Sequence, residues 1–138
     1  MTAHDLIAAI KEILCAENMV KFAYLFGSLA HNKAGRLSDI DVAVYLDGRV
    51  DFFTTRLLLM ESLAKRLRSE RFDLVVLNRA PLVLKFEVIK YGIVLKEERS
   101  RRVIFETRVL REYLDSAYLR TIQRDYLKES LRRSHTNG

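Results

Sequence analysis

The stretch FAYLFGSLAHNKAGRLSDIDVAVYL, residues 22–46, predicts a strand, a turn into a helix start, a loop and a second strand. Residues 23–26 form a short apolar and aromatic run, which is typical of a buried strand. Gly27 ends this run, and a glycine lets the backbone approach a bulky group closely. Ser28 follows at a helix N-cap position, and the N-terminus of a helix binds anions. Gly27 and Ser28 are therefore candidate phosphate-binding residues.

Two aspartates open the second strand of this stretch, DIDVAVYL at residues 39–46. Side chains alternate along a strand, so Asp39 and Asp41 share one face while the apolar residues between and after them face the core. Two adjacent carboxylates repel each other unless a cation lies between them, and Mg²⁺ prefers oxygen ligands. A pair of surface aspartates is the alternative for an isolated Asp-x-Asp. Here Gly27 and Ser28 precede the pair by ten intervening residues, which favours a phosphoryl- or nucleotidyl-transfer site.

A third carboxylate, Asp73, lies inside the apolar run FDLVVL at residues 72–77. If this run is a strand beside residues 39–46, Asp73 joins the same cluster. Three carboxylates can hold two magnesium ions, which stabilise the attacking and leaving oxygens of an in-line displacement. Asp73 could also accept the proton of the attacking group. The alternative is a residue at the end of a strand that bonds only to backbone.

The periodicity of the remaining chain predicts further helices and strands. Helices are expected over residues 3–17, after Asp51, over 82–91 and from 98 onward, and strands over 19–26, 39–46, 72–77 and 93–95. These elements indicate an α/β (α+β) fold in which a small mixed sheet of about four strands is flanked by helices. We expect one domain over residues 1–138, with a C-terminal helical segment over about 98–133 that carries a candidate kink at Asp115-Ser116.

Composition restricts the class of protein. The chain has 138 residues, of which 49% are hydrophobic and 30% charged, enough for a core in one domain. No window is as long as a membrane-spanning helix, the N-terminus lacks a signal-peptide layout, and the single Cys15 cannot form an internal disulfide. These features favour a cytoplasmic protein without a membrane partner, in which Cys15 is a small buried side chain.

The net charge of +6 comes mainly from arginines late in the chain. Acidic residues are interspersed with them, a pattern typical of a solvated helix surface. The aromatic and basic residues do not form the stacking pattern of single-strand binders, so direct nucleic-acid binding is not expected.

Together, Gly27-Ser28, Asp39-Ile40-Asp41 and the later Asp73 resemble the nucleotidyltransferase superfamily of DNA polymerase beta. The short length and the segments FDLVVLN (72–78) and PLVLKFEVIKYGIVLKE (81–97) resemble its minimal, single-domain branch, the antitoxins paired with HEPN-domain ribonuclease toxins. The resemblance implies a polymerase beta-like nucleotidyltransferase fold. It also implies transfer of AMP from ATP to a tyrosine of the toxin, in a hetero-oligomer with that partner.

Carried onto this chain, the resemblance gives each candidate residue a role. Gly27 and Ser28 would hold the triphosphate, and Asp39, Asp41 and Asp73 would bind Mg²⁺, with two ions expected. Asp73 would also help to activate the acceptor hydroxyl.

One departure from the family pattern concerns the residues after the turn. The family often has Arg-Gly where this chain has His31-Asn32. Asparagine tolerates a left-handed backbone better than most residues, so the turn itself is compatible with this change. Without the arginine, Lys33 and Arg36 become the candidates for neutralising phosphate charge.

Two other functions fit the same residues. A binding-only antitoxin would block its partner by contact and keep a vestigial site. A small-molecule nucleotidyltransferase, such as one acting on aminoglycosides, would need an added domain to hold its substrate, and the chain offers little room for one.

Overall fold

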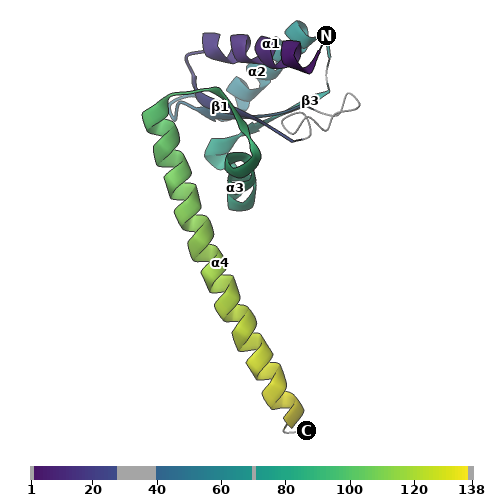
Figure 1. The fold of residues 1–138 in the computed structure, drawn as a ribbon. Helices are drawn as coiled ribbons and strands as arrows, with labels where there is room; N and C mark the ends of the chain where they lie inside the picture. The colour runs from purple at the N-terminus through teal and green to yellow at the C-terminus, as the bar shows by residue number, and fades with distance from the viewer. Residues whose placement is uncertain (1, 28–39, 70, 137–138) are drawn as a thin grey trace.

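The computed structural model describes residues 2–27, 40–69 and 71–136, with the side chains of the last two left out (Figure 1). The elements follow the expected order: α1 (Ala3–Ala16), β1 (Val20–Phe26), β2 (Ile40–Leu46), α2 (Phe52–Leu67), β3 (Phe72–Val76), the 3-10 turn η1 (Leu77–Arg79), α3 (Leu82–Tyr91), β4 (Ile93–Lys96) and α4 (Arg99–Thr136). The predicted fold class, a four-stranded mixed sheet flanked by helices, is confirmed.

The sheet has the strand order β3-β2-β1-β4. β1 runs antiparallel to both β2 and β4, whereas β2 runs parallel to β3. Phe26 pairs with Asp41 across β1 and β2, and Asp41 pairs with Asp73 across β2 and β3. The strand that carries Asp41 therefore lies between the other two segments that the sequence singled out.

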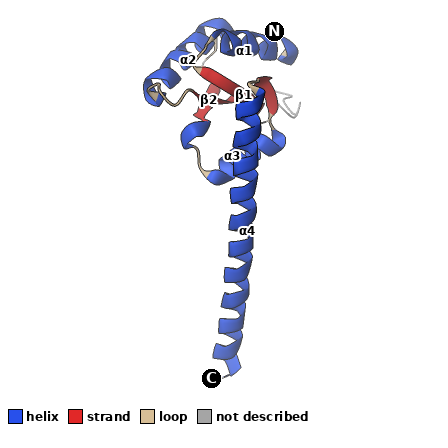
Figure 2. Ribbon diagram, turned by 90° about the vertical axis from the view of Figure 1, so that its left-hand side faces the viewer, coloured by secondary structure: helices blue, strands red, loops and turns tan. Residues whose placement is uncertain are grey.

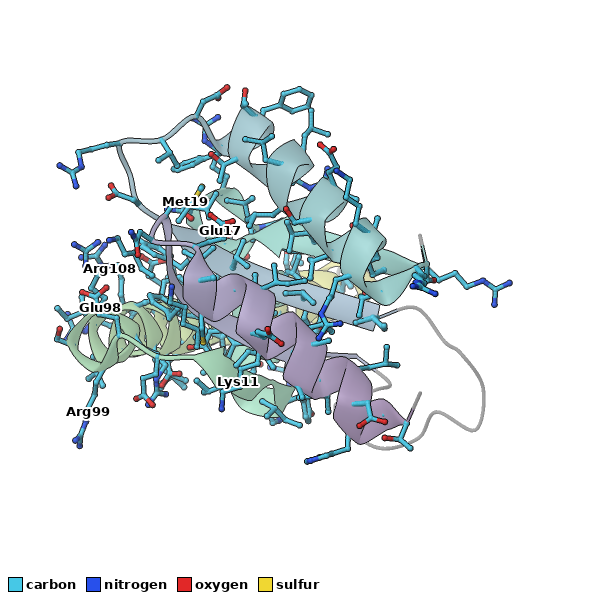
Figure 3. The ribbon with its side chains drawn as sticks, turned by 90° about the horizontal axis from the view of Figure 1, so that it is seen from above. Lys11, Glu17, Met19, Glu98, Arg99 and Arg108 are labelled. Atoms are coloured by element: carbon cyan, nitrogen blue, oxygen red, sulfur yellow. The ribbon has the colours of Figure 1, made fainter. Side chains whose placement is uncertain are left out.

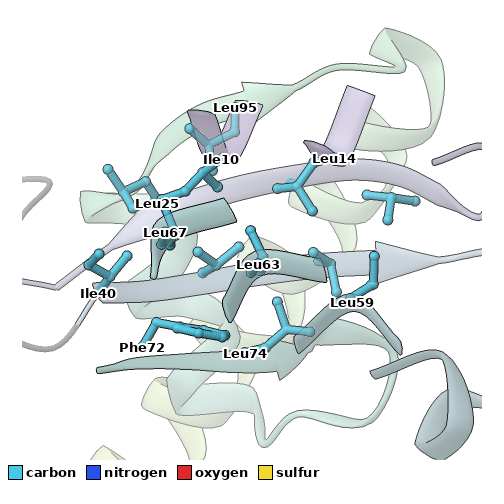
Figure 4. Packing of buried hydrophobic residues seen from close by; sticks show 14 of the residues in the cluster. Ile10, Leu14, Leu25, Ile40, Leu59, Leu63, Leu67, Phe72, Leu74 and Leu95 are labelled. Carbon is cyan, nitrogen blue, oxygen red and sulfur yellow. The ribbon is translucent and has the colours of Figure 1, made fainter. Parts of the chain in front are cut away.

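Helices pack on both faces of the sheet (Figure 1). α1 and α2 pack on one face, where a buried apolar cluster includes side chains from both helices and from β1, β2, β3 and β4 (Figure 4). On the other face, a second cluster centred on Phe22, Tyr24 and Val88 packs against α3 and the beginning of α4. Val42 and Val44 belong to the first cluster and Ala43 to the second, which is the alternation expected of a strand covered on both faces.

Lys96, the last residue of β4, ties the end of α1 to the chain that leads into α4. Its Nζ donates hydrogen bonds to the carbonyl oxygens of Leu14 and Glu17, at 3.1 and 2.8 Å. The last carbonyls of a helix lack partners within the helix, so a lysine ammonium satisfies them well. Burial lowers the pKa of Lys96 from its ordinary value. Seen from above, Glu17 and Met19 lie at the same end of the molecule as Glu98 and Arg99, where α4 begins (Figure 3).

The first turns of α4 are held against the sheet by one buried phenol. The Tyr24 hydroxyl donates a 2.6 Å hydrogen bond to Glu106 Oε1, and the Arg102 guanidinium donates to the same oxygen at 2.9 Å. Burial, and then the bond to Glu106, raise the pKa of Tyr24 far above its ordinary value, so the phenol stays a donor. Phe105 packs its ring on Phe22 at a centroid distance of 5.4 Å.

α4 is one helix of 38 residues, and beyond these contacts it projects away from the sheet (Figure 2). Helical structure runs without interruption through Asp115 and Ser116, the position of the candidate kink. Cys15 is exposed, which corrects the expectation of a buried thiol. Within the described ranges, no helix is both long and apolar enough to cross a membrane.

Replacing Tyr24 with phenylalanine tests the anchoring of α4. The variant loses the bond to Glu106 but keeps the buried ring, so we expect the free energy of unfolding to fall by about 1–2 kcal/mol. Urea denaturation followed by circular dichroism measures this change. Tyr118→Phe is the matched control, because Tyr118 is 68% exposed, and an equal loss in both variants would contradict the anchoring role.

Candidate active site

One end of the sheet brings together three of the residues that the sequence predicted. β1 ends here at Phe26, while β2 and β3 begin here. Because Phe26 pairs with Asp41 and Asp41 with Asp73, the turn residue Gly27 and both aspartates lie at this end. Side chains of residues paired across neighbouring strands point to the same face, and neighbouring strands are about 5 Å apart. Asp41 and Asp73 therefore project side by side from the face that carries Ala43, the face covered by α3 and α4.

Position 27 requires glycine for two reasons, its backbone conformation and the lack of space for a side chain. Its φ is +84°, in the left-handed region that side chains with a Cβ rarely adopt. A Cβ at this position would lie 2.3 Å from Oδ2 of Asp41. The group that approaches the Gly27 backbone is thus the Asp41 carboxylate, and the missing side chain leaves room for it.

Asp73 is held from the opposite face of the sheet by an arginine of α2. The Arg56 guanidinium donates to Asp73 Oδ1 at 3.3 Å, and its Nε donates to the Leu74 carbonyl oxygen at 2.8 Å. β3 is an edge strand, so a side chain from α2 can reach around it. Asp73 Oδ1 also accepts from the backbone N–H of Leu74 at 2.9 Å. Asp73 thus makes the backbone hydrogen bond that a purely structural residue would make. Its side chain is also 59% exposed and lies beside Asp41.

Arg56 is a residue that the sequence analysis missed. It is the one basic residue between positions 50 and 64, on a helix whose other side is apolar. A single basic residue in such a segment is weak evidence for a site residue, because the sequence does not show which strand its side chain reaches.

The other candidate residues lie outside the described part of the chain: Ser28, Lys33, Arg36 and Asp39, together with the His31-Asn32 pair. Their assigned roles stay predictions. Among the described residues, no group of three or more His, Cys, Asp or Glu side chains could hold a metal ion.

The described residues nevertheless suit a hard cation. Asp41 and Asp73 supply carboxylate oxygens from neighbouring strands on one face, and such oxygens are the ligands that Mg²⁺ prefers. Gly27 leaves the space next to Asp41 free of any side chain of its own. The donor set of this edge thus fits Mg²⁺, and Asp39 would add a third carboxylate from the residue before β2.

Replacing Gly27 with alanine tests the close approach to Asp41. The positive φ and the contact with the carboxylate both disfavour alanine, so we expect the free energy of unfolding to fall by about 1–2 kcal/mol or more. Gly48→Ala is the control, because a Cβ at Gly48 would meet no atom within 4 Å. Thermal unfolding of the two variants measures the difference, and similar melting temperatures would contradict the role given to Gly27.

Among solved structures, this chain is similar to chains of toxin–antitoxin complexes. A chain of a toxin–antitoxin complex with AMP-PNP has a TM-score of 0.71 and 29% identity, and the match covers 88% of this chain and 97% of that one. A chain of the complex between a tri-AMPylated HEPN toxin and its MNT antitoxin from Shewanella oneidensis has a TM-score of 0.68 and 26% identity, over 91% and 98% of the two chains. The toxin–antitoxin complex MntA–HepT gives a TM-score of 0.66 and 26% identity, over 90% and 97%.

Comparison with protein families and with curated proteins completes these findings. No curated protein matches the chain. The family model described as "Polymerase beta, Nucleotidyltransferase" matches residues 8–101, which include every strand of the sheet as well as Gly27, Asp41 and Asp73. The chain belongs to the polymerase beta nucleotidyltransferase family.

Proposed function

We propose that this protein is an antitoxin that transfers AMP from ATP to a tyrosine hydroxyl of a cognate HEPN toxin and thereby neutralises it. The observation that carries the proposal is the pairing of Asp41 with Asp73 on one face, next to the left-handed Gly27. The likeness to a toxin–antitoxin complex with AMP-PNP and to a complex with a tri-AMPylated toxin supports it.

The residues before β2 bind the nucleotide in this proposal. Gly27 and Ser28 hold the triphosphate, since the sequence predicts a turn into a helix start at these residues and a helix N-terminus offers backbone N–H groups to phosphate oxygens. Lys33 and Arg36 neutralise phosphate charge in place of the arginine that the family often carries. Asp39, Asp41 and Asp73 would hold Mg²⁺, with two ions expected, and the metal would supply positive charge beside the transferred phosphate.

The transfer itself is an in-line displacement. The tyrosine oxygen forms a bond to the α-phosphorus of ATP, the bond from that phosphorus to the bridging oxygen breaks, and pyrophosphate leaves. Asp73 accepts the phenolic proton as the new bond forms. The protein contributes the position of the two reacting groups and the electrostatics of the site, and needs no covalent intermediate.

Arg56 is a positioning residue for Asp73. Its two donors, one to the carboxylate and one to the adjacent backbone carbonyl, fix the side chain relative to β3. Asp73 is exposed and Arg56 only half-buried, so the contribution of this ion pair to stability is small. Its contribution is the orientation of the carboxylate that faces the acceptor.

Replacing Asp41 with asparagine tests the proposed activity. Purified protein, the cognate toxin, Mg²⁺ and each nucleoside triphosphate are incubated together, and the intact mass of the toxin is measured over time. With ATP we expect mass steps of one adenylyl group for the unchanged protein, and a rate lower by roughly 100-fold or more for Asp41→Asn. Chelation of Mg²⁺ by EDTA should abolish the mass gain in the same way.

Asp47→Asn is the matched control, since it makes the same change just after the other end of β2. The hydrogen bonds from Arg49 first, and then the charges of Arg49 and Lys21, hold the pKa of Asp47 well below its ordinary value, so the substitution removes a charged carboxylate. We expect Asp47→Asn to keep the transfer rate. A tight complex without any mass gain would contradict the proposal in favour of a binding-only antitoxin. Transfer to an aminoglycoside, with no complex, would instead favour a small-molecule enzyme.

A further inference from the structure

The second half of α4 has no described contact with the body of the protein. The last side chain that packs on the body through its ring is Tyr113, which stacks on Phe86 with the ring centroids 3.7 Å apart. Ser116 and Ala117 are half-buried, and from residue 118 to residue 134 every side chain except that of Glu129 is exposed. At about 1.5 Å per residue, residues 118–134 form a helix about 25 Å long. Figure 2 shows this end of α4 projecting away from the sheet.

Apolar side chains are ordered in rows along this free helix. On an α-helix, residues four apart lie one above the other and form a ridge. Leu114, Tyr118, Ile122 and Tyr126 form one such row and are 66%, 68%, 46% and 73% exposed. The neighbouring row contains Leu119, Leu127 and Leu131, which are 58%, 60% and 62% exposed, with Gln123 in the remaining place. We refer to these two rows as the α4 ridge.

A row of basic residues runs along one edge of the α4 ridge. It consists of Arg120, Arg124, Lys128 and Arg132, again spaced four residues apart. The row on the other edge, Thr121, Asp125, Glu129 and Arg133, has mixed charge. Over residues 118–134 five basic residues stand against two acidic ones, an excess of three positive charges.

We propose that the α4 ridge is the surface on which the toxin partner docks a helix of its own. That helix would carry an apolar row to pack on the ridge and a row of carboxylates to face Arg120, Arg124 and Lys128. This inference rests on the proposed function for the identity of the partner. The apolar row and the carboxylates expected on the docking helix are those that complement the α4 ridge and its basic row.

The composition of the ridge suits a protein helix. Tyrosine and arginine are enriched among the residues that dominate binding energy at interfaces. An unbroken row at four-residue spacing packs into the matching groove of another helix at about −50°, which gives a compact crossing contact.

The same features disfavour two other occupants of the α4 ridge, a second copy of this chain and a membrane surface. A second copy of this chain would bring another excess of positive charge to the contact, and the apolar row does not follow the seven-residue repeat of a long coiled coil. A membrane surface would attract the basic row, but Asp125 and Glu129 border the aromatic row on its other edge and oppose anionic lipid.

Variants of the free helix test the proposal without disturbing the core. Ile122→Glu places a carboxylate in the α4 ridge, and Arg124→Glu reverses one charge of the basic row. Thr121→Glu introduces the same side chain on the polar side of the helix, one residue away from Ile122. Circular dichroism checks that the three variants keep the helical content of the unchanged protein.

Affinity for the purified cognate toxin is measured by isothermal titration calorimetry. We expect Ile122→Glu to weaken binding by about 30-fold or more, as at an interface hot spot, and Thr121→Glu by less than about threefold. Arg124→Glu should weaken binding about tenfold, and the affinity of the unchanged protein should fall with added salt. Equal affinity of Ile122→Glu and Thr121→Glu would overturn the proposal.

Two further measurements determine whether the α4 ridge binds a second copy of this chain or a membrane instead of the toxin. Light scattering that shows a dimer for the unchanged protein and a monomer for Ile122→Glu, with unchanged toxin affinity, would make the ridge a self-interface and overturn the proposal. Sedimentation with phosphatidylserine vesicles that Ile122→Glu abolishes, again with unchanged toxin affinity, would make it a membrane-binding surface and also overturn it.

The binding and transfer measurements separate this inference from the proposed function. If toxin binds through the ridge but gains no AMP, the transfer reaction fails and the docking surface stands. If Ile122→Glu keeps both toxin affinity and transfer, only the docking surface fails. If the unchanged protein does not bind the toxin at all, the partner is wrong and both proposals fail.

Discussion

The position of β2 between an antiparallel and a parallel neighbour is the constraint on which the candidate site depends. Asp41 pairs with Phe26 on one side and with Asp73 on the other, so a single register brings the turn at Gly27 and both carboxylates to one end of the sheet. A slip of β2 by one residue would turn every side chain to the other face. Asp41 would then lie in the apolar cluster under α1 and α2.

The apolar residues of the sheet fix this register. Val42 and Val44 are fully buried under α1 and α2, and Leu74 packs in the same cluster from β3. Burying a side chain of this size stabilises the fold by about 1.5–3 kcal/mol, so a slip that exposed all of them would be prohibitive. The carboxylates take the positions between these residues, and the hydrophobic pattern therefore determines where the charged site lies.

This dependence explains which parts of the structure could be predicted from the sequence. Alternation in residues 39–46 placed Asp41 on the face opposite Val42, and the glycine after β1 indicated a close approach of backbone to another group. Both inferences need only neighbours in the chain. The parallel pairing of β2 with β3 was stated only as a condition, because two strands separated by α2 have no local signal that makes them neighbours.

The features that sequence reasoning missed depend on contacts between distant segments. Nothing in the sequence of its own helix marks Arg56 as a partner of Asp73. Its side chain reaches Asp73 because α2 packs over β3, which is an edge strand. Asp115 and Ser116 weaken a helix by intrinsic propensity, yet α4 passes through them unbroken. Tyr113 stacks on Phe86 just before this pair, and a tertiary contact of this kind outweighs a preference of a few tenths of a kcal/mol.

The arrangement of the two faces links the candidate site to the projecting helix. Asp41 and Asp73 project from the face on which α3 and the start of α4 pack, and the Tyr24–Glu106 bond fixes α4 to that same face. A protein held by the free part of α4 would therefore lie on the side of the sheet toward which the carboxylates point. The face under α1 and α2 is closed by the larger apolar cluster, and the two carboxylates lie on the opposite face. The Tyr24–Glu106 bond and the packing of Phe105 on Phe22 thus hold the start of a 38-residue helix on the face from which the two carboxylates project.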